Sequence, residues 1–194
     1  IYIAGAVDLA SHEGYPGHHV FNSLMEKHLV NGKGWIEYSV YPLFSPMSLL
    51  AEGSANYGVD VVFPHAERIQ FEKDVLFPLA GLDASKVEIY YQVQEVKQQL
   101  SYADNMVAKR YLDGEINDQE AVELLVKYTL VTEKKAQQRL GFIKANRAYV
   151  INYNLGQDIV KGYIEQQAKA GTHAEIWALF SELLANPKTA SMMQ

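Results

Sequence analysis

The sequence predicts a mainly α-helical fold, because local helix signals recur along it. Ser45-Pro46 combines a common N-cap residue with proline at the first helical position. Asn117 and Glu120 have the spacing of a capping box, in which each side chain caps the backbone of the other residue. Only residues 34–44, GWIEYSVYPLF, are dense in the aromatic and β-branched residues of a strand. We therefore expect a helical domain with one short hairpin or extended segment near 34–44.

The expected helices follow from start and stop signals. The first should carry the stretch HEGYPGHH, residues 12–19. Further along the chain, Thr132 and the pair Thr172 and Glu175 mark starts, while proline, glycine and Asp-Gly mark stops. The later helices are expected at about 46–62, at about 65–77, at about 85–112, from about 118, from 132 for about three dozen residues with a bend at Gly156, and from about 173.

Composition limits the classes of function that the chain fits. Its 194 residues, 48% of them hydrophobic, suit a single domain with an apolar core. The net charge is −6 and the basic residues are scattered, so we expect no nucleic-acid partner. No apolar run approaches the length of about 18 residues that a membrane span needs. The chain has no cysteine, so any metal ion must be held by His and carboxylate side chains.

The chain opens IYIAGAVDLAS, without an initiator Met or a signal-peptide pattern. HEGYPGHH follows at once, although a catalytic cleft needs walls on both sides. We therefore expect residues 1–194 to be the C-terminal catalytic part of a longer protein, with its own N-terminal region as a partner.

HEGYPGHH opens like the zinc-peptidase signature H-E-x-x-H, but its fifth position is Pro16 and the next histidines are His18 and His19. On an unbroken helix, six residues turn about 600°, so His18 would point about 120° away from His12. His19 would face the right way but lie about 10 Å along the axis. A continuous helix would therefore not chelate a metal ion here.

A break at Pro16-Gly17 would bring His18 back toward His12, because proline disfavours the helix and glycine tolerates unusual dihedral angles. A third ligand is available in Glu52, in the second turn of the expected 46–62 helix, and would complete a site of two His and one carboxylate. The alternative is a solvated turn that holds three histidines, with Glu52 an ordinary surface residue.

Two motifs together resemble the domain-of-unknown-function 885 family of zinc peptidases. The hallmark of that family is H-E-x-x-P-G-H-H, followed some tens of residues later by E-G-x-A-x-Y. HEGYPGHH at 12–19 and EGSANY at 52–57 match it, and NYNLG at 152–156 is a weaker match to a Tyr-x-x-Gly segment on a late helix. The chain departs from the family at Ser54, where many members carry Trp.

The resemblance implies a zinc site formed by His12, His18 and Glu52. Glu13 would be the general base that takes a proton from water. His19 is the reserve ligand, or a neighbour that orients the ligands.

The resemblance also implies that Tyr153 donates to the oxyanion of the tetrahedral intermediate, with Arg147 nearby in the sequence. From the residues alone, Tyr153 could equally be a half-buried aromatic, and Arg147 an ion-pair partner on a helix surface. Residues 34–44 would be either an exposed edge that binds a peptide backbone or a hairpin that covers the metal site.

These inferences predict a zinc-dependent hydrolase whose substrate is a peptide. The alternative is a non-catalytic helical module, either a degenerate peptidase or an interaction scaffold that retains the motif.

Overall fold

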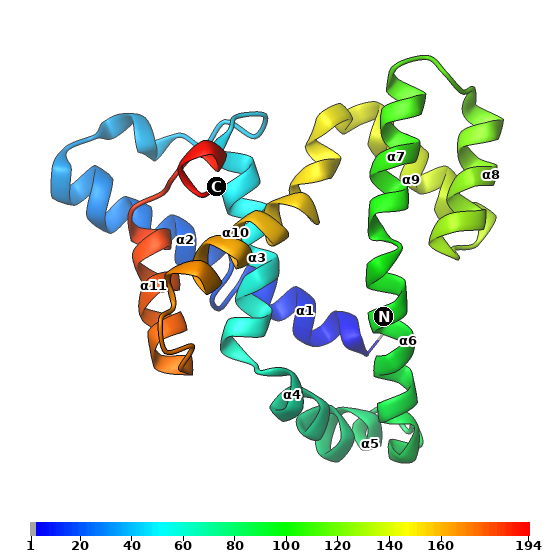
Figure 1. The fold of residues 1–194 in the computed structure, drawn as a ribbon, viewed down its shortest axis with the longest axis horizontal. Coiled ribbons are helices and arrows are strands. Elements are labelled where there is room, and N and C mark those ends of the chain that lie inside the picture. The colour runs from blue at the N-terminus through cyan, green and yellow to red at the C-terminus, as the bar shows by residue number, and fades with distance from the viewer. Residues whose placement is uncertain (1–2) are drawn as a thin grey trace.

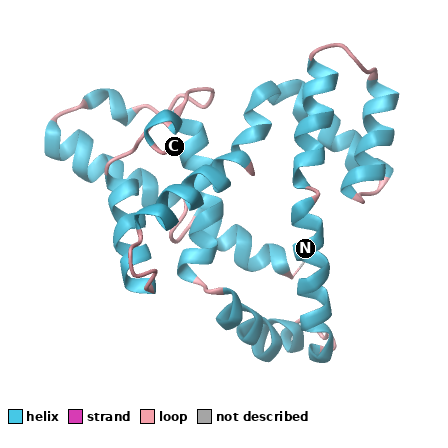
Figure 2. Ribbon diagram, viewed as in Figure 1, coloured by secondary structure: helices cyan, strands magenta, loops and turns pink. Residues whose placement is uncertain are grey.

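The computed structural model describes residues 3–194, and within this range every regular element is a helix (Figures 1 and 2). The expected mainly α-helical fold is confirmed. The α-helices are α1 (Ala4–Glu13), α2 (His18–Met25), α3 (Met47–Val62), α4 (His65–Phe71), α5 (Phe77–Leu79), α6 (Val87–Gln99), α7 (Ser101–Leu112), α8 (Asp118–Thr129), α9 (Glu133–Asn146), α10 (Leu155–Gln167) and α11 (His173–Ala185). Short π-helical or 3-10 segments are Glu26–Asn31, Ile36–Ser39, Glu72–Leu76, Ala84–Lys86, Arg147–Asn152 and Ala190–Met192.

Helix α3 is the central element of the fold. It packs against α1, α2, α10 and α11, and α10 crosses over it (Figure 1). The largest hydrophobic cluster lies between α2, α3, α10 and α11, and it includes Phe21 from α2, Leu50 from α3, Ile164 from α10 and Phe180 from α11. Most of α3 is buried as a result, so its polar residues Ser48, Glu52 and Ser54 lie inside the protein.

Two further hydrophobic clusters lie away from this centre. One joins α7, α8 and α9 through residues such as Val107, Leu125 and Ile143, and these three helices form the group at the upper right of Figure 1. The other is built around Phe77 and Val87, where α5 meets α6. Helices α6 and α7 connect the two clusters as a nearly continuous column beside the central helices (Figure 1).

Three of the four capping signals located helix starts accurately, but Ser45 does not cap α3, whose N-cap residue is Pro46 without a side-chain cap hydrogen bond. Asn117 and Glu120 form the reciprocal capping box before α8, and the Thr132 hydroxyl caps α9. Thr172 caps α11, but its pairing with Glu175 is not reciprocal, because the Glu175 carboxylate accepts instead from the amides of the 169–170 turn.

Three expectations about length and shape were wrong or only partly right. The helix expected at 85–112 is divided at Leu100, and the helix expected from 132 ends at Asn146. Arg147 then adopts φ 52°, and the 3-10 segment that follows packs against α3, α7 and α9. Residues 34–44 form no hairpin. They contain one 3-10 turn, in which Trp35 stacks on Tyr38, followed by extended backbone at Val40.

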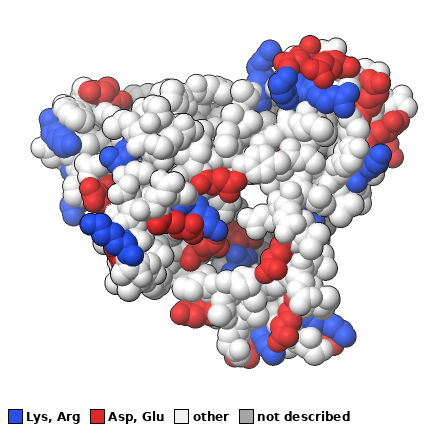
Figure 3. Space-filling model, viewed as in Figure 1, with Lys and Arg blue, Asp and Glu red and all other residues white. Residues whose placement is uncertain are grey.

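Charged side chains on the face shown in Figure 3 are mixed, with Lys and Arg interspersed among Asp and Glu. This face is hollowed between the central helices and the α6–α7 column. In the described part of the chain, no helix combines the length and the apolar character that a bilayer crossing needs.

Candidate metal centre

Glu52 lies on α3 where α10 crosses most closely. A Cβ added to Gly53 would lie 2.3 Å from the backbone of Gly156, so neither helix could approach this closely with a larger residue there. This contact explains a glycine in each of the motifs EGSANY and NYNLG. It also buries the Glu52 side chain, of which 8% is exposed.

The stretch HEGYPGHH is divided between two helices, so the expectation that it lies on the first helix alone is wrong. Helix α1 ends at Glu13 and α2 begins at His18, with Gly14–Gly17 as the turn between them. A Cβ added to Gly17 would lie 1.8 Å from the backbone oxygen of His12, so the turn needs glycine. The amide of Gly17 donates to the carbonyl of Ser11 and closes the turn. The expected break is therefore present.

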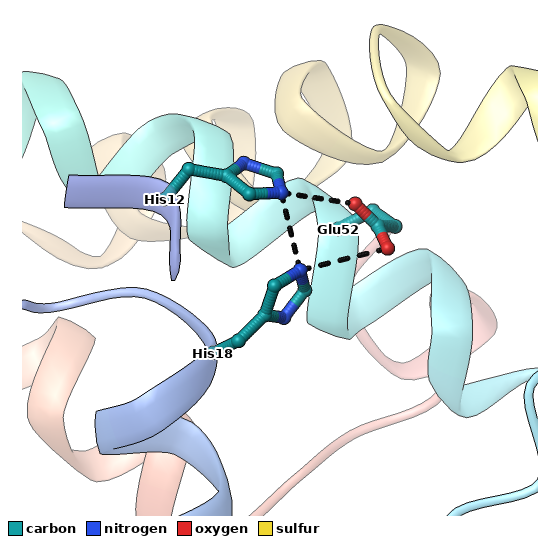
Figure 4. A group of neighbouring side chains, drawn as sticks. All are labelled: His12, His18 and Glu52. Atoms are coloured by element: carbon teal, nitrogen blue, oxygen red, sulfur yellow. Dashed lines mark hydrogen bonds and ion pairs between the residues drawn. The ribbon is translucent and has the colours of Figure 1, made fainter. Parts of the chain in front are cut away.

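The break brings His18 next to His12 and Glu52 (Figure 4). The two Nε2 atoms are 3.1 Å apart. The Glu52 carboxylate approaches His12 with Oε2, at 3.3 Å from Nε2, and His18 with Oε1, at 3.6 Å from Nε2. The three side chains come from α1, α2 and α3, and their ends point toward one another (Figure 4).

These separations fit a zinc ion. Ligand atoms about 2.1 Å from a tetrahedral zinc ion lie about 3.4 Å from each other. The described residues give Glu52 Oε2 no hydrogen bond, although it is buried. A buried carboxylate oxygen without a donor is costly unless a cation or a proton lies beside it. Two imidazole nitrogens and one carboxylate are also the protein ligands of many catalytic zinc sites.

Asn56, one helical turn after Glu52, fixes the tautomer of His12. Its Nδ2 donates to the backbone carbonyl of Tyr153 at 2.7 Å, and a carbonyl can only accept, so the amide is oriented with Oδ1 toward His12. That Oδ1 lies 2.9 Å from Nδ1 of His12, which must therefore carry the proton. In neutral His12 the Nε2 lone pair then faces Glu52 and His18, as a metal ligand requires.

The electrostatics of Glu52 keep it ionised. Burial alone would raise the pKa of Glu52, but contacts with His12, His18 and Tyr149 outweigh burial and lower it to about 2. The Glu52 carboxylate in turn raises the pKa of His12 above 6.5, against the effect of burial, with a smaller contribution from the charge of Glu13. The ionised Glu52 carboxylate therefore lies against the imidazole rings of His12 and His18.

The remaining predicted site residues lie at different distances from this group. Glu13 is exposed at the end of α1, next to His12 in sequence. Tyr153 is half-buried and holds Asn56 through its backbone carbonyl. His19 is exposed, with its ring against that of Tyr15, and is not part of the group. Arg147 is also exposed, and it borders a surface depression beside the turn between α7 and α8.

Sequence reasoning missed two residues that hold the ligands. The Tyr149 hydroxyl donates to Oε1 of Glu52 at 2.6 Å, and Asn56 orients His12. Asn56 had a readable signal, since a residue four positions after Glu52 on a helix faces the same way. Tyr149 lies 97 residues from Glu52, and no local pattern connects them.

The candidate site is thus identified from the positions of the chain's own side chains. Among the described residues, one group of three His, Cys, Asp or Glu side chains could hold a metal ion. It consists of His12, His18 and Glu52, whose ligand atoms all lie within 4.8 Å of one another. Comparison of the chain with protein-family models, with curated proteins and with solved structures found no match.

Proposed function

We propose that this chain is the catalytic part of a zinc-dependent hydrolase that cleaves peptides. The observation that carries the proposal is the convergence of His12, His18 and Glu52 from three helices, with the tautomer of His12 set by Asn56. A solvated turn would not need a buried carboxylate between two histidines. The resemblance of HEGYPGHH and EGSANY to a zinc-peptidase family points to the same reaction.

His12, His18 and Glu52 would hold the zinc ion. When bound, zinc supplies Lewis acidity, which polarises a carbonyl group and lowers the pKa of water. Asn56 keeps His12 in the ligand tautomer, and Tyr149 holds the Glu52 carboxylate toward the histidines. Both act on the ligands in the way that strengthens zinc binding in known sites.

Glu13 is the residue suited to act as general base. It is adjacent in sequence to His12 but is not in the ligand group, and its charge contributes to the raised pKa of His12. In the proposed reaction, the exposed carboxylate would take a proton from water and pass it to the leaving amine.

A cavity of about 860 Å³ supports a peptide as substrate, and it meets the candidate site at Asn56 and Tyr153, although none of the three ligands lines it. It begins at Asn56 and Tyr153 and runs between α10 and the α6–α7 column, in the hollow seen in Figure 3. Its volume is in the range of ligand sites in proteins. Side-chain amides line it, from Asn56, Gln98, Gln99, Asn154 and Gln157. Each amide offers donors and an acceptor, as an extended peptide backbone requires.

The test compares zinc content and peptide cleavage in the wild type and in Glu13→Gln. We expect about one zinc ion per chain in both, since glutamine removes a base and no ligand. Turnover should fall by a factor of about 100 to 10,000. Glu26→Gln, which changes another exposed glutamate, is the matched control and should keep full activity. A chain that binds no zinc at neutral pH would instead be a non-catalytic module.

A further inference from the structure

The segment before α3 is fixed to the helix that carries Glu52. The Tyr41 hydroxyl donates to Oγ of Ser48 at 2.9 Å, and the Ser48 hydroxyl donates to the carbonyl of Leu43. Ser48 is 1% exposed and lies one helical turn before Glu52. The position of Phe44, next in the chain, is therefore set relative to the metal centre.

Phe44 lies against a residue that contacts a proposed zinc ligand. Its ring meets that of Tyr149 edge to face, with 5.7 Å between the ring centroids. The Tyr149 hydroxyl is bonded to Glu52, and the Tyr149 ring is 6.0 Å from that of Tyr153, which borders the cavity. Phe44 thus begins a row of aromatic rings that passes the metal centre and reaches the cavity.

Phe44 is nevertheless 68% exposed. An exposed phenylalanine on a mobile loop needs no explanation, because much of a protein surface is apolar. This ring is held in place instead, and most of its apolar surface is left in water. Covering that surface with an apolar group would be favourable, because it removes apolar surface from water. Because the ring is already fixed, covering it costs little conformational entropy.

We propose that Phe44 is a specificity-determining residue, which binds an apolar side chain of the peptide substrate next to the scissile bond. This inference rests on the function proposed above. An aromatic ring packs well against aliphatic groups and prefers other rings in edge-to-face or offset arrangements.

Binding to the full chain loaded with zinc tests the subsite without turnover. Hydroxamates chelate zinc, so we would titrate phenylalanine hydroxamate and glycine hydroxamate into the protein by calorimetry. We expect the phenylalanine compound to bind about tenfold more tightly. Phe44→Ser should remove most of this ratio, and Phe44→Tyr should keep it. The selectivity for peptides with Phe over Ser beside the cleaved bond should change in parallel.

Ile36→Ser is the matched control, since Ile36 is 74% exposed in the same segment. It should leave the affinity ratio unchanged. If the protein binds zinc but binds the two hydroxamates with equal affinity, the subsite alone is overturned. The subsite is also overturned if Ile36→Ser reduces the ratio of the two hydroxamate affinities as much as Phe44→Ser does. A protein that takes up no zinc would overturn the proposed function and the subsite with it.

Discussion

The hydroxyl of Tyr149 donates a hydrogen bond to Oε1 of Glu52, with 2.6 Å between the two oxygens. Burial, and then the Glu52 carboxylate, raise the pKa of Tyr149, so the phenol stays protonated and remains a donor. The bond holds the buried carboxylate by Oε1, while the other oxygen, Oε2, approaches Nε2 of His12. Tyr149 therefore belongs to the candidate metal centre, although it lies 97 residues from Glu52 in sequence.

Replacing Tyr149 should weaken zinc binding without unfolding the protein. Tyr149→Phe removes the donor and leaves the ring against Phe44, so we expect zinc affinity to fall by about 10- to 100-fold. Competition with a chromophoric chelator would measure the dissociation constant.

Tyr153→Phe is the matched control for that substitution, because Asn56 is held by the backbone carbonyl of Tyr153 and not by its hydroxyl. It should keep zinc affinity, while its turnover reports whether the hydroxyl stabilises the oxyanion. Equal zinc affinities for Tyr149→Phe and the wild type would show that the bond does not position Glu52.

Two substitutions separate the roles of the Asn56 amide, whose Oδ1 accepts from Nδ1 of His12 and whose Nδ2 donates to the carbonyl of Tyr153. Asn56→Leu removes the acceptor for Nδ1 of His12, so zinc affinity should fall by about 10- to 100-fold. Asn56→Asp keeps an acceptor and should retain most of the affinity, but its carboxylate would face the carbonyl of Tyr153 and lower the melting temperature. Calorimetric titration with zinc and thermal unfolding measure the two effects. The same loss of affinity in both variants would contradict the tautomer argument.

Gly17 should be intolerant of any side chain. Gly17→Ala would place a Cβ at 1.8 Å from the carbonyl oxygen of His12, so the turn must open and move His18 away from the other ligands. We expect lower stability and zinc affinity reduced by at least about tenfold. Gly141→Ala, in an open position on α9, is the control, and it should stabilise the protein by about 0.5–1 kcal/mol. Unchanged zinc affinity in Gly17→Ala would mean that the turn does not set the position of His18.

Stability should depend on pH in opposite ways with and without zinc. In the metal-free protein, the raised pKa of His12 gives a contribution that is present below about pH 6.5 and is lost at higher pH. The pKa of Glu52, lowered from 4.5 to about 2, gives a contribution that is present above pH 4.5 and is lost on acidification. The metal-free protein should therefore be most stable between these values.

Zinc needs deprotonated ligands, so the stabilisation that it adds should grow as the pH rises from about 5 to 8. Melting temperatures measured with zinc and with a chelator should diverge over this range. Parallel curves would place the zinc ion away from these histidines.

Much of the fold was predictable because its signals are local. A cap such as Asn117 acts within one helical turn, and so the sequence shows it directly. The break at Arg147 depends instead on how residues 147–152 pack against α3, α7 and α9, and helix-forming sequence on both sides concealed it. Residues 34–44 have strand composition, but in the described residues no second strand is present to pair with them.

The same distinction applies to the candidate site. The ligands His12, His18 and Glu52 belong to short motifs, and the break at Pro16-Gly17 follows from the conformational preferences of those two residues. Which of His18 and His19 faces His12 depends on how the chain re-enters a helix, and this required the structure.

Two hydrogen bonds of the metal centre, Glu52 to Tyr149 and Asn56 to Tyr153, each span 97 residues. All three ligands lie within residues 12–52, but the contacts that orient them can form only when the chain has reached residue 153. During synthesis, a nascent chain would thus carry the ligands for a long time without a finished site. Tight zinc binding would therefore indicate that residues 149–153 have packed against α3.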